Sequence, residues 1–198
     1  AYGKSIGTDS IPCSGISSIT SADFAFAKSL DCTVKLVGTA AQPEAGTCQV
    51  YVSPNMVSKS HPLAAANGVG NCAIVDSSNN GVTSYYGPGA GRYPTANSIV
   101  SDIVRVMNGQ ASEAFPPKLV GGDANALKVD GDYSAEFYVR GSYDKADDAS
   151  KHGITVKKVL AAGKEGEDFA LITESCKLSA VMKFVEGKAK GGVVMPVL

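Results

Sequence analysis

The sequence predicts an α/β chain of the α+β kind, in which a mixed sheet with helices on one face is followed by a small ferredoxin-like sandwich. Three observations predict it. Apolar residues recur at helical spacing over 95–107 and 177–185, and short strand-like runs lie between these helices. The charged side chains also divide the chain, because residues 1–134 carry 18 of them and residues 135–198 carry 19 in half the length.

The first predicted element is a helix that opens near Thr20. Thr20 can cap this helix, and Asp23 stands three residues further on, which is the spacing of a capping box. Two strands are predicted to follow, over 33–39 and 48–53. The apolar positions of the helix follow helical spacing and are Ala22, Ala25, Phe26 and Leu30.

A hairpin and a long helix are predicted next. The apolar runs 72–76 and 81–86 flank a polar turn, which is typical of a β-hairpin. The helix runs from about Thr95 to Met107. Its apolar stripe has the spacing of a helix that faces a core and consists of Ala96, Ile99, Val100, Ile103, Val104 and Met107.

The domain organisation is predicted to be 1–109, a linker over 110–134, and a second domain over 135–198. Glycine and proline pairs in the linker favour loops and turns. The second domain has the order β-α-β-β-α-β, with elements expected at 137–142, 144–152 (a short polar helix or turn), 154–161, 168–173, 177–185 and 193–197.

Composition excludes several classes of function. The 198 residues are 44% hydrophobic, with 18 basic and 19 acidic side chains and a net charge of −1. This balance argues against nucleic acid or an anionic membrane as the main partner. No run of 18 apolar residues predicts a membrane-spanning helix, and residues 1–7 lack the pattern of a secretory signal.

The five cysteines are odd in number and widely spaced, and no C-x-x-C pair occurs. With only two histidines in the chain, His61 and His152, no metal site is predicted. We expect buried thiols in a reducing compartment, the cytoplasm or the plastid stroma. The cysteines are Cys13, Cys32, Cys48, Cys72 and Cys176.

A glycine-rich loop joins the predicted hairpin directly to the long helix. Gly87, Gly89 and Gly91 let the backbone approach a ligand closely, because no Cβ intervenes. The helix N-terminus behind them offers free N–H groups to an anion or a polar ligand edge. The alternative is a tight strand-to-helix turn, in which Gly89 would have a positive φ. The full G-x-G-x-x-G pattern is absent.

The run from Gly87 to Ser98, followed by residues 99–103, resembles the signature of homoserine dehydrogenases. Three further segments resemble that family in the same order, namely 15–23, 34–38 and 61–71. Together these matches cover about residues 1–108. Residues 135–198 resemble the ACT regulatory domain that many bacterial-type members carry at the C-terminus, mostly through the order of elements.

The resemblance implies NAD(P)-dependent interconversion of aspartate 4-semialdehyde and homoserine. In the family, the cofactor lies on an N-terminal Rossmann domain and a lysine acts on the substrate. Neither a strand–G-x-G-x-x-G–helix unit nor a lysine at the family position is found in these 198 residues. We therefore expect no catalytic residue and no NAD(P) binding by this chain alone. The loop residues expected near the nicotinamide are Gly87, Pro88, Gly89, Ala90 and Gly91.

The ACT-like region departs from its family, because Asp144 is not followed by Pro-Gly and few residues precede Gly153. We expect a truncated first helix and loss of the usual amino-acid pocket, or residues missing from the sequence. The leading hypothesis is the C-terminal part of a homoserine dehydrogenase, a substrate and dimerisation segment that is not competent alone. The alternative is a non-catalytic scaffold or binding subunit of a larger complex. Either needs a protein partner or a second copy.

Overall fold

The computed structural model divides the described chain into two compact units. One unit holds Ile6 and residues 60–110, and the other holds residues 7–59 together with residues 128–198. The predicted domains 1–109, 110–134 and 135–198 follow family segments, and their boundaries stay a prediction. The described residues are 6–43, 47–110, 128–142, 146–162, 168–186 and 192–198.

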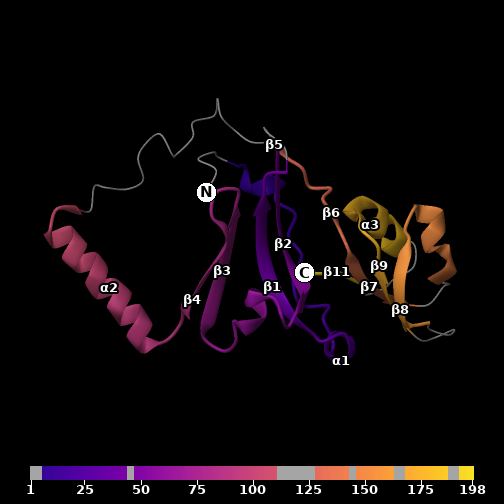
Figure 1. Ribbon diagram of the computed structural model, residues 1–198, viewed down its shortest axis with the longest axis horizontal. Coiled ribbons are helices and arrows are strands. Elements are labelled where there is room, and N and C mark those ends of the chain that lie inside the picture. The colour runs from indigo at the N-terminus through magenta and orange to yellow at the C-terminus, as the bar shows by residue number, and fades with distance from the viewer. Residues whose placement is uncertain (1–5, 44–46, 111–127, 143–145, 163–167, 187–191) are drawn as a thin grey trace. The chain divides into compact units, whose positions relative to one another are not determined.

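The larger unit contains a mixed sheet near its N-terminus. Strand β1 (Cys32–Ala41) pairs antiparallel with β2 (Thr47–Ser58) in one unbroken register. The short strand β5 (Lys128–Val129) joins the other edge of β2 in parallel. Helix α1 (Ser21–Ser29) and a short 3-10 helix (Thr8–Ser10) precede these strands. Both predicted strands are present and are longer than predicted, and they lie side by side (Figure 1).

The second sheet of the larger unit has four antiparallel strands in the order β11-β7-β9-β8. This order puts the first strand between the fourth and the third, as the predicted β-α-β-β-α-β succession requires. A short 3-10 helix occupies the place of the first helix of the predicted succession. The elements are β7 (Phe137–Ser142), the 3-10 helix (Ala146–His152), β8 (Val156–Ala161), β9 (Asp168–Thr173), α3 (Leu178–Glu186) and β11 (Val193–Pro196). A further pair of two-residue strands, β6 (Ser134–Ala135) and β10 (Cys176–Lys177), lies beside them.

Both faces of this four-stranded sheet are covered. Alternate residues of a strand point to opposite faces, and the core separates accordingly into two clusters. On one face, Phe137 and Val139 of β7 pack with Phe184 of α3. On the other face, Tyr138 packs with Ala27 of α1 and Met56 of β2. The strand β7 is therefore buried from Phe137 to Gly141.

Two buried charges link α1 to the sheet. The Asp23 side chain is fully buried, and its carboxylate accepts hydrogen bonds from Arg140 Nε at 2.7 Å and Nη2 at 3.0 Å. The Tyr138 hydroxyl donates a third hydrogen bond at 2.8 Å and the backbone N–H of Thr20 a fourth at 2.7 Å. The predicted capping box of Thr20 and Asp23 is confirmed. Arg140 also bonds Asp168 at 3.0 Å.

The environment of Asp23 keeps it ionised. Burial alone would raise the pKa of this carboxyl, but the hydrogen bonds from Arg140, Thr20 and Tyr138 outweigh that penalty and lower its pKa. The same pairing raises the pKa of Arg140, whereas burial raises the pKa of Tyr138. A charge pair of this kind is retained only when its remaining hydrogen-bonding groups are satisfied.

The smaller unit is a hairpin followed by a helix. Strand β3 (Gly70–Ser77) pairs with β4 (Gly81–Pro88), and Gly81 adopts a φ of 63° at the end of the turn. A short 3-10 helix (Pro62–Ala65) precedes the hairpin, and the His61 ring accepts the Leu63 N–H at 3.4 Å. Helix α2 (Arg92–Met107) follows directly after the loop.

The prediction that the apolar stripe of α2 faces a core is wrong for the part of the chain that the structure describes. No residue of α2 is buried, and Ile103 and Met107 are 53% and 79% exposed. The reason is that the described residues of this unit supply no second apolar layer over the stripe. The stripe of α1 is also imperfectly predicted, because the buried residues of that helix are Asp23 and Ala27.

All five cysteines are free thiols. The expectation that they are buried is wrong for four of them, since only Cys48 is buried and Cys13 is exposed. Burial raises the pKa of the Cys48 thiol. None of the helices in the described ranges is both long and apolar enough to span a membrane.

We predict that Arg140→Met destabilises the chain by about 3–5 kcal/mol, because it leaves the buried Asp23 carboxylate uncompensated. The double variant Asp23→Leu with Arg140→Met is expected to recover much of this loss, since no charge then remains buried. Urea denaturation of the single and double variants measures both effects. The exposed pair Lys59–Asp31 provides a matched control, and Lys59→Met should change stability by less than about 1 kcal/mol.

The pH dependence gives a second readout of the same pair. Because the folded pKa of Asp23 lies below its usual value of 3.8, its contribution is complete above that value and is lost as pH falls towards the folded pKa. The Asp23→Leu/Arg140→Met variant should lose less stability over this acid range than the unmodified chain. Equal acid sensitivity in both proteins would contradict the assignment.

Candidate functional site

The glycine-rich loop leaves the hairpin and enters α2 within five residues. Gly87 and Pro88 end β4, and Gly91 is the N-cap residue of α2. The Gly89 N–H donates to the Val69 carbonyl at 2.9 Å, which ties the loop to the start of β3. The Thr95 N–H donates to the Gly91 carbonyl at 3.1 Å and closes the first helical turn.

The three loop glycines differ in backbone conformation and in what a side chain at each position would meet. Gly91 has φ 120° and ψ 156°, a conformation that side-chain-bearing residues rarely adopt. Gly89 lacks the positive φ that the tight-turn alternative would give it, and a Cβ there would instead collide with the Asn71 side-chain amide. Gly87 has no heavy atom within 4 Å of the position that its Cβ would occupy.

The loop presents backbone and positive charge to solvent. The first backbone N–H groups of an α-helix have no partner within the helix and carry a partial positive charge. Arg92 adds a full positive charge at the start of α2. Its guanidinium donates to the Tyr93 hydroxyl at 2.8 Å and lies 4.8 Å from the centre of the Tyr93 ring. The arrangement fits the polar or anionic edge of a ligand.

The loop does not carry a general acid, a general base or a nucleophile. The glycines, Pro88 and Ala90 offer only backbone groups, so their chemical role is limited to bordering and orienting a ligand. His61 caps a 3-10 helix, and the ring of His152 lies 5.8 Å from that of Phe184. No group of three potential metal ligands occurs among the residues that the structure describes.

The comparison with known families decides the classification. A family model described as homoserine dehydrogenase matches residues 1–104, slightly more than half of the chain. The chain belongs to the homoserine dehydrogenase family. This confirms the resemblance that the glycine-rich run and the three preceding segments indicated.

Individual homoserine dehydrogenases match over different lengths. The Bacillus subtilis protein is 32% identical over 176 residues, which is 84% of this chain and 40% of that protein. The Lactococcus lactis protein is 39% identical over 107 residues, 54% of this chain and 25% of that protein. The Bacillus alignment is long enough that the similarity extends beyond residue 104. The chain spans less than half the length of these relatives.

Solved structures support the fold. The homoserine dehydrogenase from Thiobacillus denitrificans superimposes with a TM-score of 0.72 at 21% identity, over 93% of this chain and 46% of that one. The Staphylococcus aureus enzyme at pH 7.0 gives a TM-score of 0.68 at 23% identity, over all of this chain and 50% of that one. The mixed α/β architecture predicted from the sequence is therefore confirmed at the level of fold.

Sequence reasoning missed one contact of the loop. Asn71 lies next to Gly89 because the hairpin register pairs Asn71 with Gly87. A register count from the predicted turn could have found this neighbour, since paired strands fix which residues are opposite. The amide of Asn71 thereby forms part of the loop surface.

We predict that Gly91→Ala destabilises the chain by about 1–3 kcal/mol, because alanine is strained at a φ of 120°. Gly87→Ala is the matched control within the same loop and should stay within about 0.5 kcal/mol, since its Cβ enters open space. Urea denaturation of both variants measures the difference. A Gly87→Ala loss as large as that of Gly91→Ala would show that the loop geometry is assigned wrongly.

Proposed function

We propose that this chain is the C-terminal part of a homoserine dehydrogenase, an NAD(P)-dependent enzyme that interconverts aspartate 4-semialdehyde and homoserine. In this proposal, residues 1–109 form the segment that shapes the substrate site and the dimer, and residues 135–198 form an ACT-like domain. The observation that carries the proposal is the family match over residues 1–104, which includes the complete glycine-rich loop.

The loop is proposed to border the nicotinamide and the substrate. The open space beside Gly87 leaves its backbone accessible to a flat ring, and the α2 N-terminus faces the same loop with free N–H groups. NADH or NADPH supplies the hydride when bound in such enzymes. The proposed role of this chain is to position the ligands and to exclude water. The residues proposed to do so are Gly87, Pro88, Gly89, Ala90 and Gly91.

These residues form only one wall of such a site. Hydride transfer needs the reacting atoms about 3–3.5 Å apart, and the sequence of this chain holds no G-x-G-x-x-G unit for the pyrophosphate. The 198 residues are therefore proposed to be inactive by themselves. A non-catalytic scaffold or binding subunit remains the second candidate, and the 3-10 helix in place of the first ACT helix favours it.

The exposed stripe of α2 supports a proposal about association. Five large apolar side chains on this helix are between 48% and 79% exposed, and contiguous apolar patches of a few hundred Å² mark interfaces. We propose that a second copy of the chain covers this stripe. The residues concerned are Ile99, Val100, Ile103, Val104 and Met107.

We predict that a chimera restores activity that the isolated chain lacks. The part of the Bacillus subtilis enzyme that precedes the matched region would be joined to this chain. The chimera should oxidise NADPH with aspartate 4-semialdehyde, and the 198-residue chain should not. Gly87→Val in the chimera should lower kcat/KM at least tenfold, because it fills the space beside the loop.

Two results would contradict this proposal. Oxidation of NADPH with aspartate 4-semialdehyde by the isolated chain would contradict the proposal that the chain is inactive by itself. A chimera that binds NADPH by fluorescence but produces no homoserine would favour the scaffold, since the cofactor domain is then folded and the defect lies in this chain.

We predict that the chain sediments as a dimer or a larger species at tens of micromolar. Val100→Glu combined with Ile103→Glu should shift it to a monomer, because both charges would be buried on association. Ser101→Glu on the polar side of the same helix is the matched control and should leave the sedimentation unchanged. A soluble monomer of the unmodified chain would overturn the proposal.

A further inference from the structure

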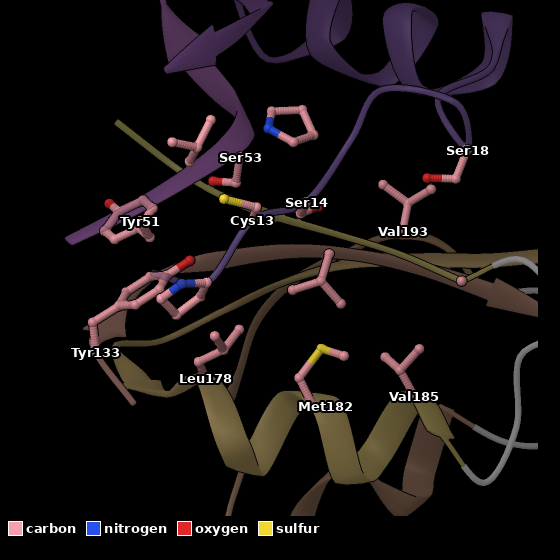
Figure 2. A pocket seen from close by; sticks show the side chains of 15 residues that line it. Cys13, Ser14, Ser18, Tyr51, Ser53, Tyr133, Leu178, Met182, Val185 and Val193 are labelled. Carbon is pink, nitrogen blue, oxygen red and sulfur yellow. The ribbon is translucent and has the colours of Figure 1, made fainter. Parts of the chain in front are cut away.

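A cavity of about 270 Å³ lies within the larger unit, whereas the glycine-rich loop belongs to the smaller unit. Its floor comes from α3 and β11, through Leu178, Met182 and Val194. Its opposite side comes from the segment around Cys13 and from β2, as Figure 2 shows. The cavity is therefore built from residues that are far apart in the sequence but belong to one packed unit.

The side of the cavity formed by β2 is fixed by hydrogen bonds. The Ser14 N–H donates to the Val52 carbonyl at 2.8 Å, and the Val52 N–H donates to the Pro12 carbonyl at 3.0 Å. This pairing holds Cys13 beside Val52 and next to Ser53. The Tyr51 ring stacks on Tyr133 with their centroids 3.8 Å apart, which makes a rigid aromatic end wall.

One polar atom in the wall, the Ser53 hydroxyl oxygen, has no hydrogen bond of normal geometry, although it lies close enough to the Tyr133 hydroxyl to lower the pKa of that group. Ser53 is 5% exposed. Buried polar groups in proteins are nearly always hydrogen-bonded. Burial raises the pKa of the neighbouring Tyr133, an effect that Tyr51 adds to and Ser53 reduces. Figure 2 places the Ser53 hydroxyl, the Cys13 sulfur and the Tyr133 hydroxyl on the same side of the cavity.

The lining restricts the charge of a ligand. None of the residues that line the cavity is acidic or basic, and the floor is aliphatic. A buried charge without a partner is strongly disfavoured, so a zwitterionic amino acid or an anion does not suit the cavity. An apolar molecule with one hydrogen-bonding group suits both the floor and the Ser53 hydroxyl.

The volume of the cavity restricts the size of the ligand. The cavity has a volume of about 270 Å³ and is open on one side. It is smaller than the roughly 300–1,000 Å³ of pockets for drug-sized ligands. The ligand is therefore a small molecule, below the usual drug size.

We propose that this cavity is a binding site for a small, neutral, amphipathic molecule, whose apolar body lies on Leu178, Met182 and Val194 and whose polar group bonds the Ser53 hydroxyl. The proposal is independent of the dehydrogenase function, because no residue of the glycine-rich loop takes part. Cys13 at the exposed side of the cavity provides a reporter for occupancy.

The test uses thiol–disulfide exchange on the full 198-residue chain. In exchange with a small disulfide, the Cys13 thiolate attacks the S–S bond, forms a mixed disulfide and releases one thiolate, so the small disulfide is itself the oxidant and no other is needed. The chain is equilibrated with dibenzyl disulfide or with bis(2-hydroxyethyl) disulfide in excess 2-mercaptoethanol. Peptide mass spectrometry then measures the adduct at Cys13 and at Cys72, which does not line the cavity.

We predict at least a tenfold preference of Cys13 for the benzyl group over the hydroxyethyl group, relative to Cys72. Benzyl alcohol, with eight non-hydrogen atoms, should slow alkylation of Cys13 by iodoacetamide at millimolar concentration, and Ser53→Ala should weaken that protection. Ser14→Trp should abolish the benzyl preference, because Ser14 is an exposed residue whose side chain lines the cavity. Ser17→Trp, equally exposed but outside the lining, is the matched control.

The same measurements can overturn the proposal. Equal benzyl preference at Cys13 and Cys72 would mean that the effect belongs to the reagent. A preference that survives Ser14→Trp, or that is lost equally in Ser17→Trp, would mean that the cavity does not hold the group. Absence of protection by benzyl alcohol would mean that the cavity binds no free neutral ligand of this size.

Discussion

A buried ion pair between Asp23 and Arg140 joins the N-terminal part of the larger unit to its C-terminal sheet. The two residues are 117 positions apart, and the carboxylate is completely buried. Ionised groups are tolerated there only because Arg140, Tyr138 and Thr20 satisfy the oxygen atoms together. The interaction therefore fixes the position of α1, and with it the layer that covers one face of β7 and its neighbours.

The segment that matches the family model is divided between the two compact units. The family match runs without interruption through residues 1–104, whereas the compact units separate between residues 59 and 60. Strand β2 also pairs with the chain end, since Ser58 donates to the Leu198 carbonyl at 2.8 Å. The larger unit thus combines part of the homoserine dehydrogenase segment with the C-terminal sheet. The glycine-rich loop lies in the other unit, where apolar side chains of α2 remain exposed.

Local patterns predicted local structure well. The short strand-like runs over 137–142 and 168–173 predicted β7 and β9 with their observed bounds, and the spacing of Thr20 and Asp23 predicted a capping box. Patterns could not reveal that Asp23 also meets Arg140, because a helix-capping role already accounts for an acidic residue in a first turn. Helical spacing likewise shows that one face of α2 is apolar but does not show what covers it. The cavity beside Cys13 depends on tertiary packing of five separate segments, and no single segment carries a signal for it.

The central claim is that residues 7–59 and 128–198 form one cooperative unit, distinct from residues 60–110. Native-state hydrogen exchange tests it most directly, because residues that open together share one free energy of opening. We expect amides of β1 and β2 to exchange with the same opening free energy as those of β7 and β9, and α2, β3 and β4 to open at lower free energy. If β1 and β2 opened together with β3, β4 and α2, and separately from β7 and β9, the claim would be contradicted.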